Sequence, residues 1–303
     1  MNFKKKAMIK KMIFGVLALG FFATSCSSDD DNSSSNLDTL TLNLSGLDPL
    51  GSDFVYEGWI IVNGAPVTTG RFTSVTFPQN FAVDTDQLAD ATAFVLSIEP
   101  LIDPDPAPAP TKILSGEFSG ATASVSTGLI GDLVNVSGTF FLRTPTDETM
   151  PGNPNNMNDQ FGVWFGAPGT PPTAALNLPD LTANPGWTYE GWVIGETGPI
   201  STGRFTDFGD RDDFTDFSGA EFNQGPPVPG EDFFLNPPTG ETFPLDVRER
   251  TVVISLEPVP DDSPAPFAIK PLVGAAGAAT APSTHNFGPN VASLPSGSVS
   301  RQN

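Results

Sequence analysis

Apolar and polar residues alternate in short runs along most of the chain, as they do in strands with one buried face. Residues 40–44 read Leu-Thr-Leu-Asn-Leu, a strict alternation. Residues 93–98 and 252–256 are apolar runs interrupted by one serine each, and they predict central strands that end at Pro100 and Pro258, because proline has no N–H for the ladder. We find no sustained helical period after residue 25. The pattern predicts an all-β protein.

Two segments of the chain repeat. Tyr56-Glu57-Gly58-Trp59 returns 133 residues later as Tyr189-Glu190-Gly191-Trp192, and Ser97-Ile98-Glu99-Pro100 returns after 158 residues as Ser255-Leu256-Glu257-Pro258. The larger second offset indicates an insertion in the second copy, over the acidic, aromatic and proline-rich residues 207–247. Units of this length indicate a duplicated domain. We therefore predict two tandem β-sandwich-like repeats, residues 39–170 and 171–303, after a signal peptide.

The N-terminal residues predict export and a lipid anchor. Five lysines precede an apolar run at residues 12–22, which suits a signal-peptide core and is shorter than the roughly 20 residues that span a bilayer. The lone cysteine, Cys26, follows small residues, and the stretch resembles a bacterial lipoprotein signal. Residues 27–31 resemble the acidic export tag of Bacteroidetes-type surface lipoproteins. The resemblance implies that residues 1–25 are removed and that Cys26 is lipidated.

The same resemblance predicts the location of the protein. Residues 26–38 would form a Ser/Asp-rich tether from the lipid on Cys26 to the first repeat. We expect the protein on the outer membrane, exposed at the cell surface or facing the periplasm. With Cys26 acylated, disulfides, thiolate metal sites and cysteine catalysis are excluded.

The charge balance excludes one class of partner. The chain has 14 basic and 35 acidic residues, a net charge of −21. Five of the basic residues precede Cys26, so the mature protein is still more acidic. Phosphate groups would be repelled, and we expect no binding to nucleic acid.

Aromatic and charged residues recur at matching positions of the two repeats. They are Tyr56, Glu57, Trp59, Arg71, Glu99 and Lys112 in the first repeat, and Tyr189, Glu190, Trp192, Arg204, Glu257 and Lys270 in the second. In a chain with so few cations, we expect each repeated arginine to pair with a glutamate of its own repeat. The alternatives are an arginine that grips a ligand and a carboxylate acid/base pair. The repeated tryptophans are predicted core anchors.

The inserted segment carries five aspartates within ten residues, which raises the question of calcium. They are Asp207, Asp210, Asp212, Asp213 and Asp216. Calcium takes six to eight oxygen ligands, but the spacing does not match the helix-flanked twelve-residue calcium loop. The segment is either a calcium site or a solvated loop, and no other cofactor is expected.

Signatures of catalysis are missing from the sequence. The one histidine, His285, lies in a Gly-, Ala- and Ser-rich stretch, and no Gly-x-Ser-x-Gly elbow, phosphate loop or His-Glu-x-x-His helix occurs. We therefore predict a non-enzymatic protein. The alternative is a glycan-binding or glycan-processing lipoprotein, with Trp164 or Trp187 stacking on sugar or a carboxylate pair hydrolysing it.

Both repeats also share a longer pattern. Residues 64–72 read Gly-Ala-Pro-Val-Thr-Thr-Gly-Arg-Phe, followed by Ile98-Glu99-Pro100; residues 198–205 are followed by Leu256-Glu257-Pro258 and Ser263-Pro264-Ala265-Pro266. This order resembles the extracytoplasmic C-terminal domain of anti-sigma-K factors, over half of each repeat. The resemblance implies a structural or binding module with an extracytoplasmic protein or glycan as partner. We expect no sigma binding, since neither the cytoplasmic helical domain nor its transmembrane helix is recognisable here.

Overall fold

The computed structural model of the chain describes residues 36–148, 157–218, 225–261 and 263–302, and residues from Asn36 onward form one compact unit. Strands make up 43% of the described residues and helices 6%, in two sandwich-like sheets. This confirms the prediction of an all-β protein with two tandem β-rich repeats. The predicted signal peptide and Cys26 lie outside the described residues. No described helix is long and apolar enough to cross a membrane.

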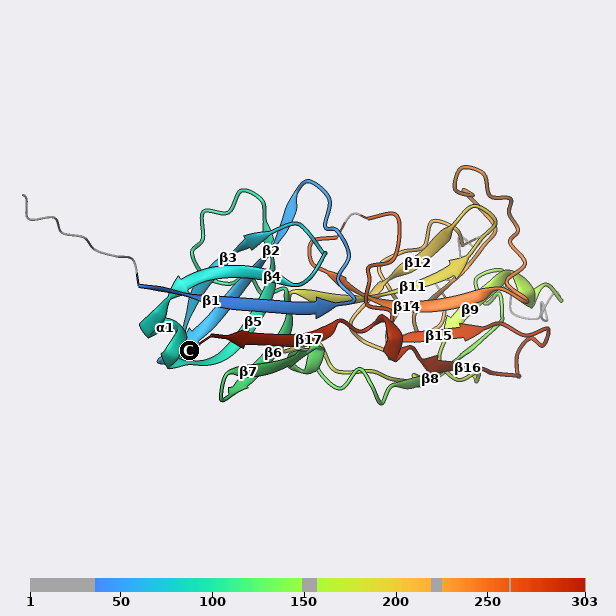
Figure 1. The fold of residues 1–303 in the computed structure, drawn as a ribbon. Helices are drawn as coiled ribbons and strands as arrows, with labels where there is room; N and C mark the ends of the chain where they lie inside the picture. Colours follow the sequence, from blue (N-terminus) through green and yellow to red (C-terminus); the bar gives the residue numbers. More distant parts are fainter. Residues whose placement is uncertain (1–35, 149–156, 219–224, 262, 303) are drawn as a thin grey trace, which may run out of the picture. The chain divides into compact units, whose positions relative to one another are not determined.

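The first sheet has eight strands in the order β3-β2-β5-β6-β7-β17-β1-β4, and every neighbouring pair is antiparallel (Figure 1). Its strands are β1 (Leu37–Ser45), β2 (Phe54–Val62), β3 (Ala65–Phe72), β4 (Gln79–Asp84), β5 (Ala91–Pro100), β6 (Lys112–Ser119), β7 (Thr122–Ser126) and β17 (Ser296–Arg301). The apolar run at residues 93–98 lies in β5, inside the sheet, as predicted.

The second sheet has nine strands in the order β12-β11-β14-β15-β16-β8-β9-β13, with β10 also paired to β8. Its strands are β8 (Ser137–Phe141), β9 (Gly162–Phe165), β10 (Leu176–Asn177), β11 (Trp187–Ile194), β12 (Pro199–Phe205), β13 (Gly230–Asp232), β14 (Thr251–Pro258), β15 (Leu272–Ala275) and β16 (His285–Pro289). The insertion at residues 207–247 contributes β13 to the edge of this sheet, beside β9.

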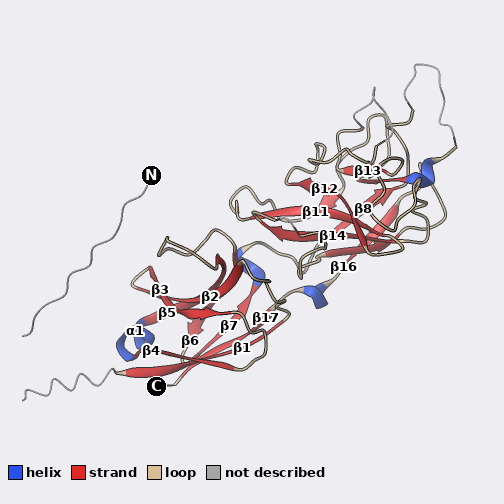
Figure 2. Cartoon of the chain, turned by 90° about the horizontal axis from the view of Figure 1, so that it is seen from above, coloured by secondary structure: helices blue, strands red, loops and turns tan. Residues whose placement is uncertain are grey.

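Helices are few and short in the described residues (Figure 2). They are α1 (Thr85–Asp90) and the 3₁₀ helices η1 (Thr127–Leu129), η2 (Asp159–Phe161) and η3 (Val291–Ser293). The sequence predicted none of them. Helix α1 has six residues and buries only Leu88, so it is too short to show a helical period in the sequence. Its one local signal is the N-cap Asp84, whose side chain accepts a hydrogen bond from the amide of Gln87.

The first hairpin of each repeat has the same register. Glu57 pairs with Arg71 across β2 and β3, and Glu190 pairs with Arg204 across β11 and β12. Both hairpins shift register one residue after the glutamate, at a β-bulge. The bulge includes a glycine with positive φ in each case, 128° for Gly70 and 119° for Gly203. The duplication therefore kept the geometry that sets each arginine beside a glutamate.

The two repeats exchange strands, which the sequence did not predict. β8 and β9 precede the expected boundary at residue 170, yet they pair in the second sheet. Conversely, β17 comes from the end of the second repeat and lies in the first sheet, between β7 and β1 (Figure 1). β8 holds the matching place in the second sheet, between β16 and β10. The expected boundary at residue 170 is therefore wrong as a division between the sheets.

The exchanged strands share a short motif. β8 contains Ser137-Gly138-Thr139-Phe140, and β17 contains Ser296-Gly297-Ser298-Val299. Each glycine sits against the next strand: a Cβ on Gly138 would lie 2.7 Å from the Leu176 side chain, and one on Gly297 would lie 2.3 Å from the carbonyl oxygen of Asn43. The motif therefore marks where each strand packs into the other repeat's sheet.

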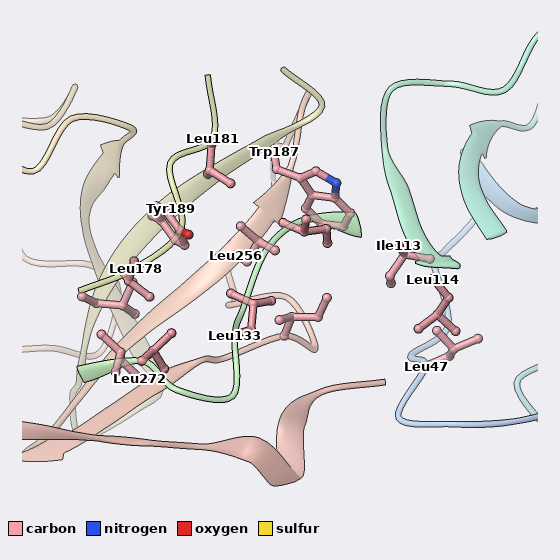
Figure 3. Close-up of a cluster of buried hydrophobic side chains, with 14 of the residues drawn as sticks. Leu47, Ile113, Leu114, Leu133, Leu178, Leu181, Trp187, Tyr189, Leu256 and Leu272 are labelled. Carbon is pink, nitrogen blue, oxygen red and sulfur yellow. The ribbon is translucent and has the colours of Figure 1, made fainter. Parts of the chain in front are cut away.

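Buried leucines and aromatic rings fill the cores. In the second repeat Leu178 and Leu256 gather with Tyr189 along β11 and β14, and Leu133, from the segment before β8, packs among them (Figure 3). Leu133 is 1% exposed. The segment that precedes β8 therefore buries Leu133 in the core of the second repeat.

The strand exchange can be tested at Gly297. We expect Gly297→Ala to lower the free energy of unfolding by about 1–3 kcal/mol, because the new carbon must displace the backbone of β1. Gly288→Ala on β16 is the control, since a Cβ there has its nearest neighbour 3.8 Å away. Thermal or urea melts of the two variants make the comparison, and equal stabilities would contradict the packing of β17 against β1.

Candidate functional site

A buried hydrogen-bond chain runs through the first repeat. The indole Nε1 of Trp59 donates to Ser97 Oγ at 2.8 Å, and Ser97 Oγ donates in turn to the carboxylate of Glu99. Glu99, only 1% exposed, also accepts from the backbone amide of Ala109 at 2.8 Å, in the proline-rich loop. Lys112 Nζ donates to the carbonyl of Ala109 at 3.1 Å. This chain ties the loop to the end of β5.

The second repeat contains the same chain, residue for residue. Trp192 Nε1 donates to Ser255 Oγ at 2.7 Å, and Ser255 Oγ donates to Glu257. Glu257 accepts from the amide of Phe267 at 2.9 Å, and Lys270 Nζ donates to the carbonyl of Phe267 at 2.6 Å. The repeated tryptophans, glutamates and lysines therefore hold the proline-rich loops in place.

The expected arginine–glutamate pair is present in the first repeat. Arg71 Nε lies 3.0 Å from Glu57 Oε2. Its guanidinium also donates to the carbonyl oxygens of Pro100 and Leu101, at the end of β5. Thr68 Oγ1 donates to the other oxygen of Glu57 at 2.6 Å. Arg71 thus connects three neighbouring strands, β3, β2 and β5.

In the second repeat the expected pair is absent. Arg204 pairs instead with Asp213, with NH2 and Oδ2 3.1 Å apart, and Asp213 belongs to the inserted loop. The NH1 group of Arg204 also donates to the backbone carbonyl oxygen of Asp261 at 3.0 Å. Glu190 accepts a hydrogen bond from Ser201 Oγ, and the described residues offer it no ion pair. The expectation was wrong here because the insertion supplies a competing carboxylate.

Three carboxylates meet where that pairing is lost. One oxygen each of Glu190, Glu257 and Asp261 lies within 4.8 Å of the others, and this is the one such acidic group within the described ranges. Burial raises the pKa of Glu190 and of Glu257 to about 7 each. In the first repeat, Arg71 compensates the equivalent Glu57. In the second repeat Arg204 is paired with Asp213, and its charge acts on Glu190 from beyond ion-pair distance.

The five loop aspartates do not converge on one point. Asp212 turns inward and accepts from the amide of Gly230 at 2.7 Å, whereas Asp213 is paired with Arg204. Asp207 and Asp210 accept from amides within the loop itself. The residues described here contain no group of three acids from this loop close enough to share an ion. The geometry therefore gives the calcium prediction no support.

Two further buried acids lie on β13 and were not predicted from the sequence. Asp232 is fully buried and accepts from Trp164 Nε1 at 2.9 Å and from the amide of Thr146 at 2.9 Å. Its neighbour Glu231 accepts from the hydroxyl of Ser218. Burial raises the pKa of Asp232 to about 7 and that of Glu231 to about 9. No local signal marks them, because Trp164 and Thr146 lie far away in the sequence.

None of the four tryptophans is a surface platform. Trp59, Trp164, Trp187 and Trp192 are each at most 3% exposed. Trp187 donates its Nε1–H to the carbonyl of Lys112 at 3.2 Å. The alternative of glycan stacking on Trp164 or Trp187 is therefore wrong, since neither ring presents a face to solvent. The prediction that the repeated Trp59 and Trp192 are core anchors agrees with their burial.

His285 contacts the backbone of its own segment. Its Nδ1 accepts from the amide of Gly277 at 3.2 Å, and its Nε2 lies 2.9 Å from the carbonyl oxygen of Ala279. The ring packs beside Phe140, with centroids 5.2 Å apart. Both ring nitrogens are thus engaged with backbone.

A cavity of about 540 Å³ lies at the proline-rich loops. Its wall comes from the segment after β1, the end of β5 and both repeats' loops. Apolar side chains dominate the lining: Pro49, Leu50, Phe54, Pro110, Pro260 and Phe267. Asp48, Glu257 and Asp261 are the charged members of the wall. The sequence identified both loops, but nothing in it showed that they share a cavity.

No known protein family, curated protein or solved structure matches this chain. The resemblance to anti-sigma-K factors therefore stays a prediction. The function has to be argued from the geometry of the network and the cavity.

The buried acids predict a pH dependence. A carboxyl group whose pKa is raised by folding binds its proton more tightly in the folded protein than in the unfolded protein. The stabilisation from Glu190 and Glu257 is therefore fully present below about pH 4.5 and is lost as pH rises through about 7. Between pH 5 and 8 we expect a loss of about 2 kcal/mol or more, on the order of 5 °C in Tm.

Thermal melts across this pH range test the expectation. The double variant Glu190→Gln/Glu257→Gln should reduce the slope without removing it, because an amide has no proton to lose whereas Glu231 and Asp232 keep their raised pKa values. Glu117→Gln, at an exposed position of β6, removes one charge and should leave the slope unchanged. A wild-type Tm that stays constant or rises from pH 5 to 8 would contradict the burial of these acids.

Proposed function

We propose that this protein is a non-enzymatic, lipid-anchored module of the cell envelope that binds an apolar extracytoplasmic ligand in the cavity at its proline-rich loops. The observation that carries the proposal is the contrast between two sets of residues. Every repeated charged side chain is bonded within the protein. The cavity wall, in contrast, offers apolar surface to a ligand.

The argument against catalysis rests on accessibility. A carboxylate pair that hydrolyses a glycosidic bond must reach the sugar from both sides. Glu257 is 0% exposed and Glu190 is 6% exposed, and both accept hydrogen bonds from serine hydroxyls. Their counterparts Glu99 and Glu57 are equally enclosed. Such carboxylates support a structural role better than a chemical one.

The cellular location is argued from the sequence. The lysine-rich start, the apolar run at residues 12–22 and the small residues before Cys26 support export and acylation. A strongly acidic, thiol-free folded part suits an environment outside the cell, where it does not need to contact nucleic acid or anionic lipid. The outer membrane, on either face, is the location we propose.

The anchor is tested at Cys26. In the bacterium that makes this protein, Cys26→Ala should abolish labelling by radioactive palmitate and move the protein from the membrane to the soluble fraction, because no other residue can be acylated through a thiol. Ser28→Ala is the matched control and should keep both properties. A Cys26→Ala variant that remains labelled and membrane-bound would contradict the anchor.

The cavity is tested by blocking it. Ala265 lines the cavity and Ala107 is its counterpart in the first repeat, outside the lining. We expect the neutral fluorophore N-phenyl-1-naphthylamine to bind saturably to the wild type and to Ala107→Trp, and at least about ten-fold more weakly to Ala265→Trp. Fluorescence titration measures this. Equal binding by both variants would reject the cavity as the ligand site.

A further inference from the structure

We propose that the ligand of this cavity is an uncharged amphiphile, a molecule whose hydrocarbon part fills the apolar cavity and whose head carries several hydroxyl groups. The inference rests on the proposed binding function and specifies its ligand class. It follows from a second, polar pocket that adjoins the cavity.

The polar pocket has a volume of about 260 Å³ and shares two wall residues, Asp261 and Ser263, with the apolar cavity. The rest of its wall comes from the β11–β12 hairpin and from the insertion, which contributes Asp213 and Phe214. An amphiphile can therefore place its hydrocarbon part in one space and its head in the other. A purely apolar ligand would use only the first.

The insertion is fixed to the hairpin by hydrogen bonds in both directions. The amide of Arg204 donates to Asp213 Oδ1 at 2.8 Å, and the amide of Asp213 donates to the carbonyl oxygen of Arg204 at 3.0 Å. A Cβ on Gly203 would lie 2.8 Å from the Cβ of Phe214, so the insertion packs directly against the bulge of β12. The pocket wall is therefore preformed, and the first repeat, which lacks the insertion, has no equivalent of these wall residues.

The pocket presents hydrogen-bond donors and acceptors side by side. A guanidinium has five N–H groups. Within the described residues, the contacts of Arg204 with Asp213 and with the backbone of Asp261 engage three of them, which leaves two for a ligand or water. The carboxylate of Asp213 and the hydroxyl of Ser201 supply acceptors on the same wall.

This mixture favours a head that is uncharged. A hydroxyl group both donates and accepts, so neighbouring hydroxyls can bond to Arg204 and to Asp213 at once. An ammonium group only donates and would lie beside the guanidinium of Arg204, whereas a carboxylate only accepts and would lie beside Asp213. The hydrocarbon part is held by the rings of Phe54 and Phe267 in the cavity wall, where it leaves water.

Three eight-carbon compounds with different heads test the inference. Octyl glucoside, octanol and octylamine are each titrated, below the concentration at which they form micelles, against the full-length folded protein holding N-phenyl-1-naphthylamine, and displacement is followed by fluorescence at pH 7.5. We expect octyl glucoside to displace the fluorophore at least about five-fold more effectively than octanol, because its hydroxyls bond in the polar pocket. Octylamine should be no more effective than octanol.

Variants then place the preference in the polar pocket. Arg204→Met keeps a long side chain without N–H donors and should bring octyl glucoside to the level of octanol. Because Arg204 lines only the polar pocket and its ion pair is exposed, binding of N-phenyl-1-naphthylamine should change by less than about two-fold. Arg248→Met is the matched control and should keep the preference. Arg248 pairs with Asp246, with side chains 42% and 41% exposed against 42% and 51% for Arg204 and Asp213, and it lines neither space.

The outcomes separate this inference from the proposed function. Octyl glucoside no better than octanol in the wild type, octylamine as effective as octyl glucoside, or a preference that survives in Arg204→Met would each overturn the hydroxylated ligand while leaving an apolar cavity. Failure of N-phenyl-1-naphthylamine and of all three compounds to bind would instead overturn the proposed function.

Discussion

The structure depends on one buried carboxylate in each repeat. Glu99 and Glu257 end the central strands β5 and β14 and accept the serine of a Trp-Ser-Glu chain on one side and a loop amide on the other. A carboxylate without these donors would be costly to bury. Because the donors come from two different elements, the glutamate can be buried only when the proline-rich loop has closed onto the strand end. Strand, core tryptophan and loop are thus ordered together.

The insertion of residues 207–247 explains why the repeats differ. In the first repeat Arg71 neutralises Glu57 and caps the carbonyls beyond β5. In the second, Asp213 of the insertion takes the arginine, and β13 adds two buried acids, Glu231 and Asp232. The raised pKa values of the acids therefore concentrate in the second repeat. In the first repeat Glu57 is paired with Arg71, whereas in the second repeat Glu190 accepts from Ser201 and Arg204 is paired with Asp213.

Local patterns predicted the strands at residues 40–44, 93–98 and 252–256, because alternation and apolar runs depend only on near neighbours in the sequence. They could not predict which sheet a strand joins: Ser137-Gly138 and Ser296-Gly297 read alike and exchange places. Arg204 was expected to pair with a glutamate of its own repeat, and the competing Asp213 could not be foreseen because it belongs to the insertion, which the first repeat lacks. Trp164 was considered as a possible sugar platform. Its indole N–H donates to Asp232, and this contact could not be predicted because the two residues are 68 positions apart in the sequence.

Strand exchange and loop closure together account for a single shared cavity. Each repeat contributes a proline-rich loop fixed by its own glutamate, and the exchanged strands β8 and β17 make each sheet depend on the other repeat for its completion. Because the two loops are fixed, their side chains do not collapse into the cavity between them. Proline strengthens the effect, because its ring removes backbone freedom that would otherwise favour collapse. The two repeats therefore line one asymmetric cavity, whose wall is mostly apolar and whose charged members are Asp48, Glu257 and Asp261.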